Sequence, residues 1–281
     1  MDREIVLTLL VLALGGPLST AFGGWSLGHS GLDGAALERR LWQAIWMPLL
    51  PLALGLAALL GWALVEPDDA ERVPWSWVVI AAPFGLIWFR MSVRAAWALL
   101  RSTQGLPAAT IGLIRPRVVL SPQFAESVDA DAVAAVLEHE HAHARHRDPL
   151  RIWLAQIATD LQWPRPSARS RLRLWRTALE IARDDEARQH GAHGADLAAG
   201  VLAAARFSVH RTQPAAVALL IGDSNMQQRV ARLLAPLHAA DATPAGVRGR
   251  LMVICVGILI ASVIGVVGGE SIVRVILGAS S

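Results

Sequence analysis

Four long apolar stretches constrain the fold of this 281-residue chain more than any other feature. They cover about residues 5–22, 41–65, 73–89 and 251–269. An apolar run of about 18 residues is long enough to cross a bilayer as a helix. Hydrophobic residues make up 54% of the chain and charged residues only 17%, whereas soluble domains carry roughly 25% charged residues. We therefore expect four transmembrane helices.

The distribution of charge predicts how these spans are oriented. The connection 66–72 carries four acidic residues and one arginine, whereas five arginines lie between residues 90 and 117, directly after the third span. Cytoplasmic flanks of membrane spans are enriched in basic residues. The segment 90–250 is therefore predicted to be cytoplasmic, in a multi-pass protein of the cell membrane (the inner membrane in a bacterium). We interpret the net charge of +3 as favouring contact with anionic membrane lipid, and we expect no direct binding of nucleic acid.

Smaller features refine this membrane assignment. Arg90, Arg94 and Arg101 fall on one face of a helix, which predicts either a basic helix leaving the membrane or an ordinary solvated helix face. The acidic beginning, residues 1–4, favours a retained first span over a cleaved signal peptide. The single cysteine, Cys255, excludes an intrachain disulfide and a cysteine-ligated zinc site.

The segment 127–148, SVDADAVAAVLEHEHAHARHRD, predicts a helix that carries chemistry. Aspartates near its start suit a helix N-terminus, and no glycine or proline interrupts it before Pro149. His139 and His143 are four residues apart, so their imidazoles lie about 6 Å apart on one face and can reach one zinc ion. Glu140 stands beside that face, where its carboxylate can take a proton from the attacking water. The pattern HExxH therefore predicts a zinc-dependent hydrolase.

Two further histidines of this helix are not expected to bind the ion. His141 points to a different face from His139 and is predicted to face solvent or a partner. His146 lies near the face of His143, but it is about 10 Å along the axis from His139, too far to share one ion on a straight helix. The alternative for the whole segment is a solvated, histidine-rich helix without metal.

A catalytic zinc ion needs a third protein ligand and one open position. The segment 171–189 predicts a second helix that could supply this ligand. Glu180 and Asp184 are four residues apart, so one could bind the ion while the other accepts the free N–H of a ligating histidine. Spacing alone leaves Glu180, Asp184 and Glu186 open as the ligand, and an exposed acidic patch is the alternative.

Several motifs resemble those of the BlaR/MecR-type membrane metallopeptidases, the antirepressor proteases (metallopeptidase family 56). Residues 139–148 are similar to that family's HELxHxxRxD, with His141 in place of leucine. Residues 180–184, EIARD, look like the family's ELACD. This resemblance implies that Glu180 is the third zinc ligand and that Asp184 supports a ligating histidine. Three further segments resemble the family's strand before the zinc helix, its WxxP and a helix with an RI core: residues 112–122, 163–166 and 228–234.

The resemblance also implies a fold, a mostly α membrane protein with four transmembrane helices. A cytoplasmic gluzincin-like zinc peptidase domain, with a small strand or hairpin plus helices, would be inserted between spans three and four. Its alternating run 114–120 is expected to form an edge strand beside the cleft. Residues 1–101 would then hold three spans and a basic juxtamembrane helix, 102–249 the peptidase domain, and 250–281 the fourth span and a short tail.

The predicted function is a zinc-dependent endopeptidase with one zinc ion. Its substrate would be a protein, such as a transcriptional repressor or another cytoplasmic regulator. Because the chain has no tyrosine, His190, His193 or a nearby arginine is the candidate donor to the oxyanion. The family's antibiotic-sensing members carry a penicillin-binding domain after the last span, and only about ten residues follow Gly269, so no such role is expected.

Other functions remain open at this stage. One is a quality-control or CAAX-type membrane metalloprotease, which shares the HExxH pattern and a glutamate ligand. Another is a non-catalytic metal-binding receptor or scaffold. A metal transporter is disfavoured because the four predicted spans carry essentially no ionisable residues.

Overall fold

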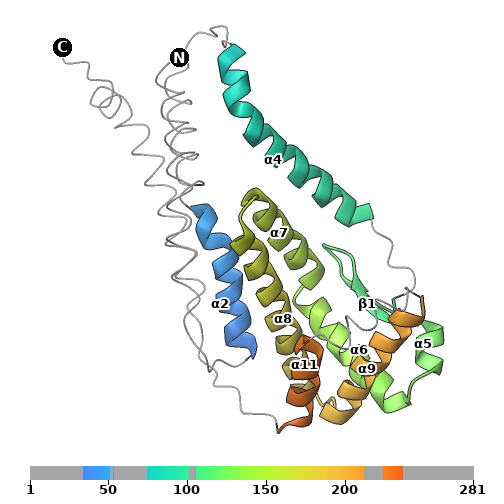
Figure 1. Ribbon diagram of the computed structural model, residues 1–281. Coiled ribbons are helices and arrows are strands. Elements are labelled where there is room, and N and C mark those ends of the chain that lie inside the picture. The colour runs from blue at the N-terminus through green and yellow to red at the C-terminus, as the bar shows by residue number, and fades with distance from the viewer. Residues whose placement is uncertain (1–33, 51–52, 54–74, 101–105, 212–223, 237–281) are drawn as a thin grey trace. The chain divides into compact units, whose positions relative to one another are not determined.

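The computed structural model describes residues 34–50, 53, 75–100, 106–211 and 224–236 (Figure 1). The chain divides into two compact units, neither of which is continuous in sequence. The unit that contains the predicted zinc helix, called the catalytic unit below, comprises residues 29–42 and 89–241. The other unit comprises residues 1–28, 43–88 and 242–281.

The predicted membrane spans lie only partly within the described residues. The first (5–22) and fourth (251–269) lie outside them, as does most of the second. The described part of the second span lies in α2 (Gly34–Trp46) and the short helix η1 (Met47–Leu49), and most of the third lies in α4 (Trp75–Leu100). Among the described residues, no helix combines the length and the apolar character that crossing a membrane requires. The four transmembrane helices therefore remain a prediction.

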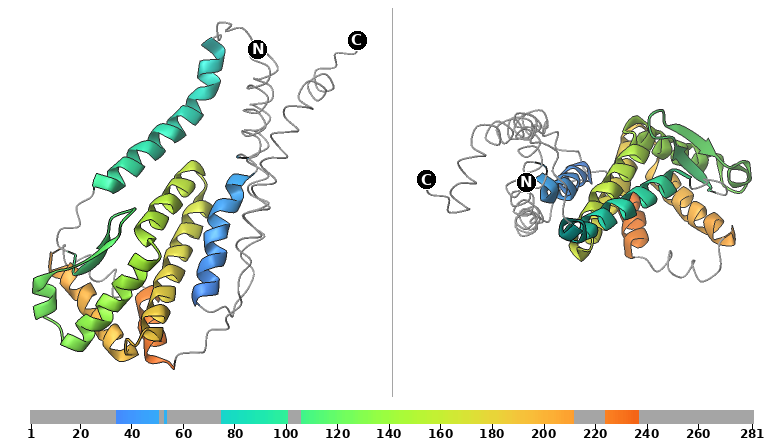
Figure 2. Two further views of the ribbon diagram at one scale, coloured as in Figure 1. Left: turned by 180° about the vertical axis from the view of Figure 1, so that it is seen from behind. Right: turned by 90° about the horizontal axis from the view of Figure 1, so that it is seen from above.

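The catalytic unit is mostly helical with one small sheet, as the sequence predicts. Helix α6 contacts α7, α8, α9 and both strands. Helices α7 and α8 lie side by side, and α11 packs against α8 and α9 (Figures 1 and 2). The elements are β1 (Ala108–Ile111), β2 (Arg117–Leu120), α5 (Pro122–Glu126), α6 (Ala130–Arg145), α7 (Asp148–Leu161), α8 (Pro166–Gln189), α9 (Gly194–Arg211) and α11 (Ser224–Leu234).

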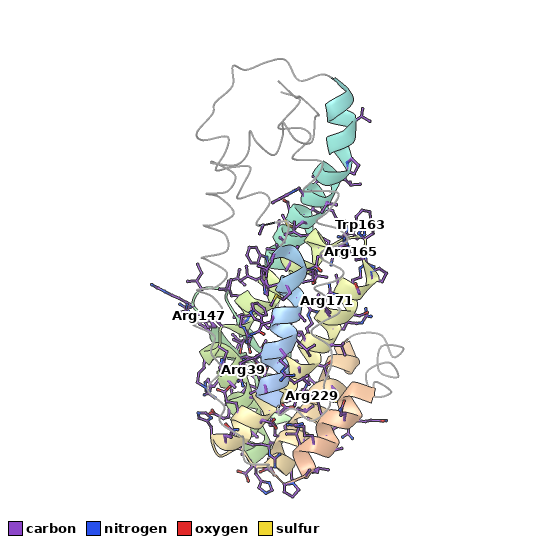
Figure 3. The ribbon with its side chains drawn as sticks, turned by 90° about the vertical axis from the view of Figure 1, so that its left-hand side faces the viewer. Arg39, Arg147, Trp163, Arg165, Arg171 and Arg229 are labelled. Carbon is purple, nitrogen blue, oxygen red and sulfur yellow. The ribbon has the colours of Figure 1, made fainter. Side chains whose placement is uncertain are left out.

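Helix α6 is the predicted zinc helix. Asp129 occupies its N-cap position and Asp131 lies in its first turn, where a carboxylate stabilises the positive end of the helix dipole. After the helix ends, the exposed Arg147 adopts the left-handed conformation, with a φ of 52° (Figure 3). This residue turns the chain directly into α7, whose first residue is Asp148. The turn thereby brings Asp148 back towards the histidines of α6.

Strands β1 and β2 form an antiparallel hairpin in which Ala108 pairs with Leu120. Its turn requires Gly112, because the φ there is 94° and a Cβ would lie 2.8 Å from a backbone oxygen. The predicted strand 114–120 is therefore shorter than expected, since Ile114 lies in the turn and is 77% exposed. The sequence does not predict β1, whose four residues, AATI, show no alternation of polar and apolar side chains.

Close packing of small residues positions α9 against α6. A Cβ added at Gly200 of α9 would lie 2.4 Å from the Cγ2 atom of Val136 and 3.1 Å from the backbone oxygen of Ala132. The two helices can therefore approach closely only because this residue is glycine. The adjoining core joins α6, α8, α9 and α11 through Ala135, Ala187, Leu197, Ala198 and Leu233.

Candidate metal centre

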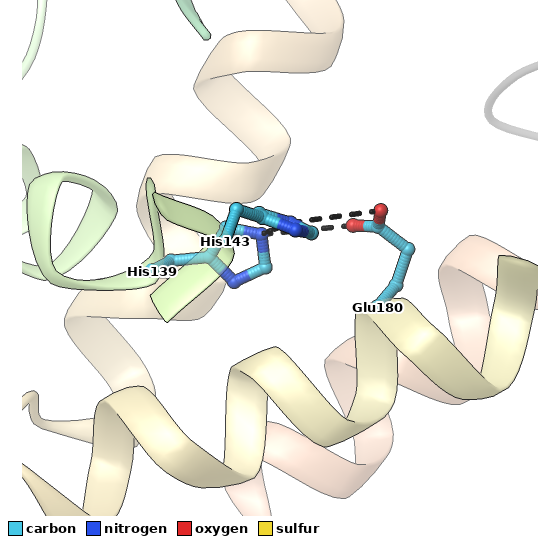
Figure 4. A group of neighbouring side chains, drawn as sticks. All are labelled: His139, His143 and Glu180. Atoms are coloured by element: carbon cyan, nitrogen blue, oxygen red, sulfur yellow. Dashed lines mark hydrogen bonds and ion pairs between the residues drawn. The ribbon is translucent and has the colours of Figure 1, made fainter. Parts of the chain in front are cut away.

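His139, His143 and Glu180 converge on one point of the catalytic unit (Figure 4). The two Nε2 atoms lie 3.0 Å apart. The oxygens of Glu180 lie 3.6 Å from Nε2 of His139 and 3.8 Å from Nε2 of His143. Ligand atoms bound at about 2.1 Å to a tetrahedral ion lie about 3.4 Å from one another. The three side chains therefore have the spacing that a single metal ion requires.

Two aspartates orient the imidazoles from behind. Nδ1 of His139 lies 2.9 Å from Oδ1 of Asp184, although its N–H bond is not aimed straight at that oxygen. Nδ1 of His143 lies 2.9 Å from Oδ2 of Asp148. An ionised carboxylate can only accept a hydrogen bond, so each neutral imidazole carries its proton on Nδ1. When both imidazoles are neutral, as metal binding requires, two Nε2 lone pairs face each other beside the Glu180 carboxylate, an arrangement that fits a divalent cation between them.

Electrostatics also favour a cation at this point. Burial raises the pKa of Glu180, but His139 and Arg229 outweigh burial and hold that pKa well below its ordinary value. Burial lowers the pKa of His139, yet the carboxylates of Asp184 and Glu180 together raise it to about 10. Without a metal ion, His139 is therefore protonated at neutral pH. A metal ion that binds here replaces that proton.

Glu140 lies beside the three converging side chains. The hydroxyl of Thr110, in β1, donates a hydrogen bond to Oε2 of Glu140 at 2.8 Å and lies equally close to the backbone oxygen of Glu140. The residue predicted as the catalytic base is thus oriented by an element outside its own helix. The sequence analysis did not single out Thr110, because a lone threonine in a short segment carries no signal.

Arg229 of α11 is a further residue of the site (Figure 3). Its guanidinium donates two hydrogen bonds of 2.9 Å to the carboxylate of Asp184, and its Nη1 lies 3.1 Å from Oε2 of Glu180. The sequence analysis left the donor to the oxyanion open between an arginine and two histidines. The histidines, His190 and His193, are both exposed. Arg229 is the arginine that the structure brings to the site.

A family model described as BlaR1 peptidase M56 matches residues 98–233. The matched segment includes the two histidines, Glu140 and Glu180. Over these residues the chain is similar to the M56 peptidase family. M56 enzymes are metallopeptidases, so the resemblance noted in the sequence is confirmed at this level. The comparisons with curated proteins and with solved structures gave no match.

The structure distinguishes between the three acidic residues that the sequence left open as the third metal ligand. Glu180 lies with both histidines, and Asp184 lies behind His139. Glu186 instead pairs with Arg145 and with His146, each at 2.9 Å. His141 is more than half exposed, with 54% of its side chain accessible. Of the three acidic candidates, the structure therefore brings Glu180 to the Nε2 atoms of both histidines.

A buried ionic network lies behind His143 and supports the metal group, which consists of His139, His143 and Glu180. Asp148 is fully buried and accepts hydrogen bonds from His143, from Nε and Nη2 of Arg183, and from Nη1 of Arg151. Burial raises the pKa of Asp148, but the hydrogen bonds from His143 and Arg183 outweigh burial and lower it to about 2. Asp148 therefore stays ionised and keeps the proton of His143 on Nδ1.

The same network reaches α2, outside the matched segment. Nη2 of Arg151 donates a hydrogen bond to Oε1 of Glu38, and Nε1 of Trp175 donates another to that oxygen at 2.8 Å. The Arg151 guanidinium also lies over the ring of Trp42, 4.8 Å from its centroid. Residues 34–42 thus contribute to the catalytic unit, although the sequence suggested only a connection between spans.

The arginines predicted to form a basic stripe have a different environment. Nη1 of Arg90 lies 3.0 Å from Oδ1 of Asp160, and Nε of Arg94 lies 2.9 Å from Oδ2 of the same residue. Asp160 belongs to α7 and is almost fully buried. Both arginines therefore share one buried carboxylate within the catalytic unit, which leaves this group of three with a net charge of +1. Arg101 lies outside the described residues.

Two pockets lie near the metal group. The apolar pocket, of about 240 Å³, is lined by His139, Glu140 and Glu180 together with aliphatic side chains of α6 and α9 such as Val136 and Leu197. The arginine pocket, of about 670 Å³, lies between the second half of α4, the hairpin, α7 and α8, and its lining includes Thr110 and Arg176. A chain crossing the metal group could therefore occupy both.

Proposed function

We propose that the protein is a zinc-dependent endopeptidase of the gluzincin type, with His139, His143 and Glu180 as the ligands of one zinc ion. One observation carries this proposal. The Nε2 atoms of two buried imidazoles lie 3.0 Å apart with a carboxylate beside them, while an aspartate oxygen lies 2.9 Å from each Nδ1 atom. This donor set of two histidines and one glutamate is typical of catalytic zinc sites in peptidases.

Each residue of the site has a role in peptide hydrolysis. Zinc, when bound, supplies the Lewis acidity that polarises the scissile carbonyl. Glu140, oriented by Thr110, takes a proton from the attacking water and delivers it to the leaving amine. Arg229 fixes the carboxylates of Glu180 and Asp184 and offers positive charge where the oxyanion develops. The apolar pocket takes an aliphatic or aromatic side chain of the substrate and excludes water from that side.

The proposed setting is the cell membrane, in a bacterium the inner membrane, with the catalytic unit in the cytoplasm. The support is the four apolar stretches and the excess of arginine after the third of them. The proposed substrate is a cytoplasmic protein that regulates transcription, such as a repressor, and cleavage would transmit a signal received at the membrane. This part of the proposal rests on the resemblance to the antirepressor proteases and on the family match.

The variant Glu140→Gln tests the catalytic role, because it removes the base and leaves the three ligands intact. We expect it to retain one zinc ion per chain, measured by elemental analysis, and to lose about 10²- to 10⁴-fold in the rate of peptide cleavage. Glu138→Gln is the matched control, since Glu138 lies on the same helix and pairs with Arg145 away from the metal group. Comparative proteomics of cells carrying either variant would then identify the substrate.

The outcomes separate the enzyme from the alternatives. If Glu140→Gln bound zinc and kept both its cleavage products and its cellular function, the protein would be a non-catalytic metal-binding receptor or scaffold. If the cleaved proteins were misfolded membrane proteins or prenylated chains, and no regulator were among them, a quality-control or CAAX-type protease would be the correct assignment.

A further inference from the structure

We propose that the arginine pocket is a substrate subsite that selects an acidic side chain, aspartate or glutamate, through Arg176. This subsite lies on the side of the scissile bond opposite to the side chain that enters the apolar pocket. The inference rests on the proposed peptidase function and adds the class of sequence that the enzyme would cut.

The same strand and the same helix line both pockets, so the two pockets belong to one cleft. In β1, Ala108 lines the apolar pocket and Thr110, two residues later on the same face of the strand, lines the arginine pocket. In α8, Glu180 lines the apolar pocket and Arg176 lines the arginine pocket. Strand and helix therefore each pass from the apolar pocket, which His139 and Glu180 of the metal group line, to the arginine pocket.

The spacing of the two pockets corresponds to about two residues of an extended substrate. Arg176 and Glu180 are four residues apart on α8, so they share a face and are separated by about 6 Å along the helix. An extended peptide advances about 3.3 Å per residue. A substrate with its scissile bond at the metal group would therefore present a side chain to Arg176 about two residues away from that bond.

Among the described residues, no acidic group forms an ion pair with Arg176 that would neutralise its positive charge. Its side chain is exposed, and within the described part of the chain it forms no hydrogen bond and no ion pair within 4 Å. The nearby Glu180 acts on it electrostatically, but that carboxylate is already held by Arg229. The other cation of the pocket, Arg94, is held by the carboxylate of Asp160, which it shares with Arg90.

The rest of the pocket suits the stem of such a side chain. Trp97 and Trp153 supply aromatic surface, and Ile111 and Ile152 supply aliphatic surface. These groups can pack against the methylene groups of a glutamate while its carboxylate meets the guanidinium of Arg176. A lysine or arginine at the same place would face the same positive charge and be rejected.

Cleavage profiling tests this subsite. The full-length, zinc-loaded protein is incubated with a proteome-derived peptide library, and the new termini are identified by mass spectrometry. We expect apolar residues to be enriched on one side of the cleaved bond, and aspartate or glutamate about two residues away on the other side. A matched pair of fluorogenic peptides, with Glu or Gln at that place, then gives the ratio of kcat/KM, expected to be about 10.

Three variants decide the role of Arg176. Arg176→Gln should lower the Glu/Gln ratio to about 1, and Arg176→Glu should reverse the preference towards a Lys peptide. Arg173→Gln is the control, because Arg173 is an exposed arginine on the same helix and donates a hydrogen bond to Ser170. An unchanged ratio in Arg176→Gln, or a wild-type profile without acidic enrichment, would overturn the proposal.

Failure of the peptidase assignment is recognised separately. If the wild-type protein cut no peptide, the proposed function would fail, and the subsite would be tested by the fluorescence anisotropy of the labelled Glu and Gln peptides. Tighter binding of the Glu peptide that is lost in Arg176→Gln would support the subsite. Equal binding of both peptides would refute it.

Discussion

Glu38 offers the most direct test of the buried network, because it lies outside the M56 match and is only 5% exposed. Its carboxylate accepts hydrogen bonds from Arg151 and from the indole of the fully buried Trp175. Glu38→Gln keeps the size and one oxygen acceptor but removes the charge. Glu38→Ala removes both interactions and leaves the indole nitrogen without a partner.

The structure sets the expected magnitudes. Removing one partner of a buried ion pair costs about 3–5 kcal/mol, but the side chain of Arg151 is 21% exposed and keeps its second bond, to Asp148, so a smaller loss applies. We expect Glu38→Gln to lower the free energy of unfolding by about 2 kcal/mol. Glu38→Ala should lower it by about 4 kcal/mol, because an unsatisfied buried N–H adds about 1–3 kcal/mol.

Urea unfolding of the full chain, with Glu126→Ala as an exposed control, measures these differences. A double-mutant cycle with Arg151→Met isolates the pair, and we expect a coupling free energy of about 1.5 kcal/mol or more between positions 38 and 151. If Glu38→Ala behaved like the control, or if the two substitutions were additive, the network would not hold α2 to the catalytic unit and the reasoning would be refuted.

Three further predictions concern the metal centre and its packing. Asp184→Asn should weaken zinc binding about 10- to 100-fold in isothermal titration calorimetry, because it removes the ionised acceptor behind His139; affinity equal to the wild type would contradict this. Burial lowers the pKa of His139, but Asp184 and Glu180 raise it to about 10 in the metal-free protein. Zinc affinity should therefore rise about tenfold per pH unit between pH 6 and 8, since one proton leaves. The interaction of His139 with Asp184 and Glu180 stabilises the metal-free fold fully below about pH 6.5, and this contribution is lost as the pH approaches 10. A zinc affinity that did not change with pH would contradict the raised pKa of His139. Gly200→Ala should destabilise the fold by about 1–3 kcal/mol in thermal unfolding, despite its better helix propensity, because the new methyl group would overlap Val136; an increase in stability would show that α9 can shift.

The sequence predicts the part of the candidate site that lies on a single helix. His139 and His143 lie on one helix, and their relation follows from helical geometry alone. Glu180 is different, because spacing left three acidic residues of α8 open and the structure separates them through packing of α8 on α6. Thr110 and Arg229 could not be found from the sequence. They come from a short strand and a distant helix, and only tertiary packing brings them to the histidines.

The charged residues illustrate the same limit. Periodicity correctly groups Arg90 and Arg94 on one helix face, but it cannot show that the buried Asp160, 66 positions beyond Arg94, receives both of them. Similarly, the sequence shows Glu38 within an ordinary charged connection, and its burial against Arg151 depends on contacts more than a hundred positions away. Hydropathy describes how polar a segment is, whereas ion pairing within the fold determines whether its charged side chains are buried or exposed.

The position of Glu38 has a practical consequence for anyone who wishes to work with a shortened enzyme. A fragment cut at the borders of residues 98–233 would contain every proposed ligand and the proposed base. It would nevertheless expose the Trp175 face of α8 and deprive Arg151 of its acidic partner. A soluble version would therefore be better designed with residues 34–42 joined through a linker, or supplied as a separate peptide in trans, so that both pieces of this discontinuous domain are present.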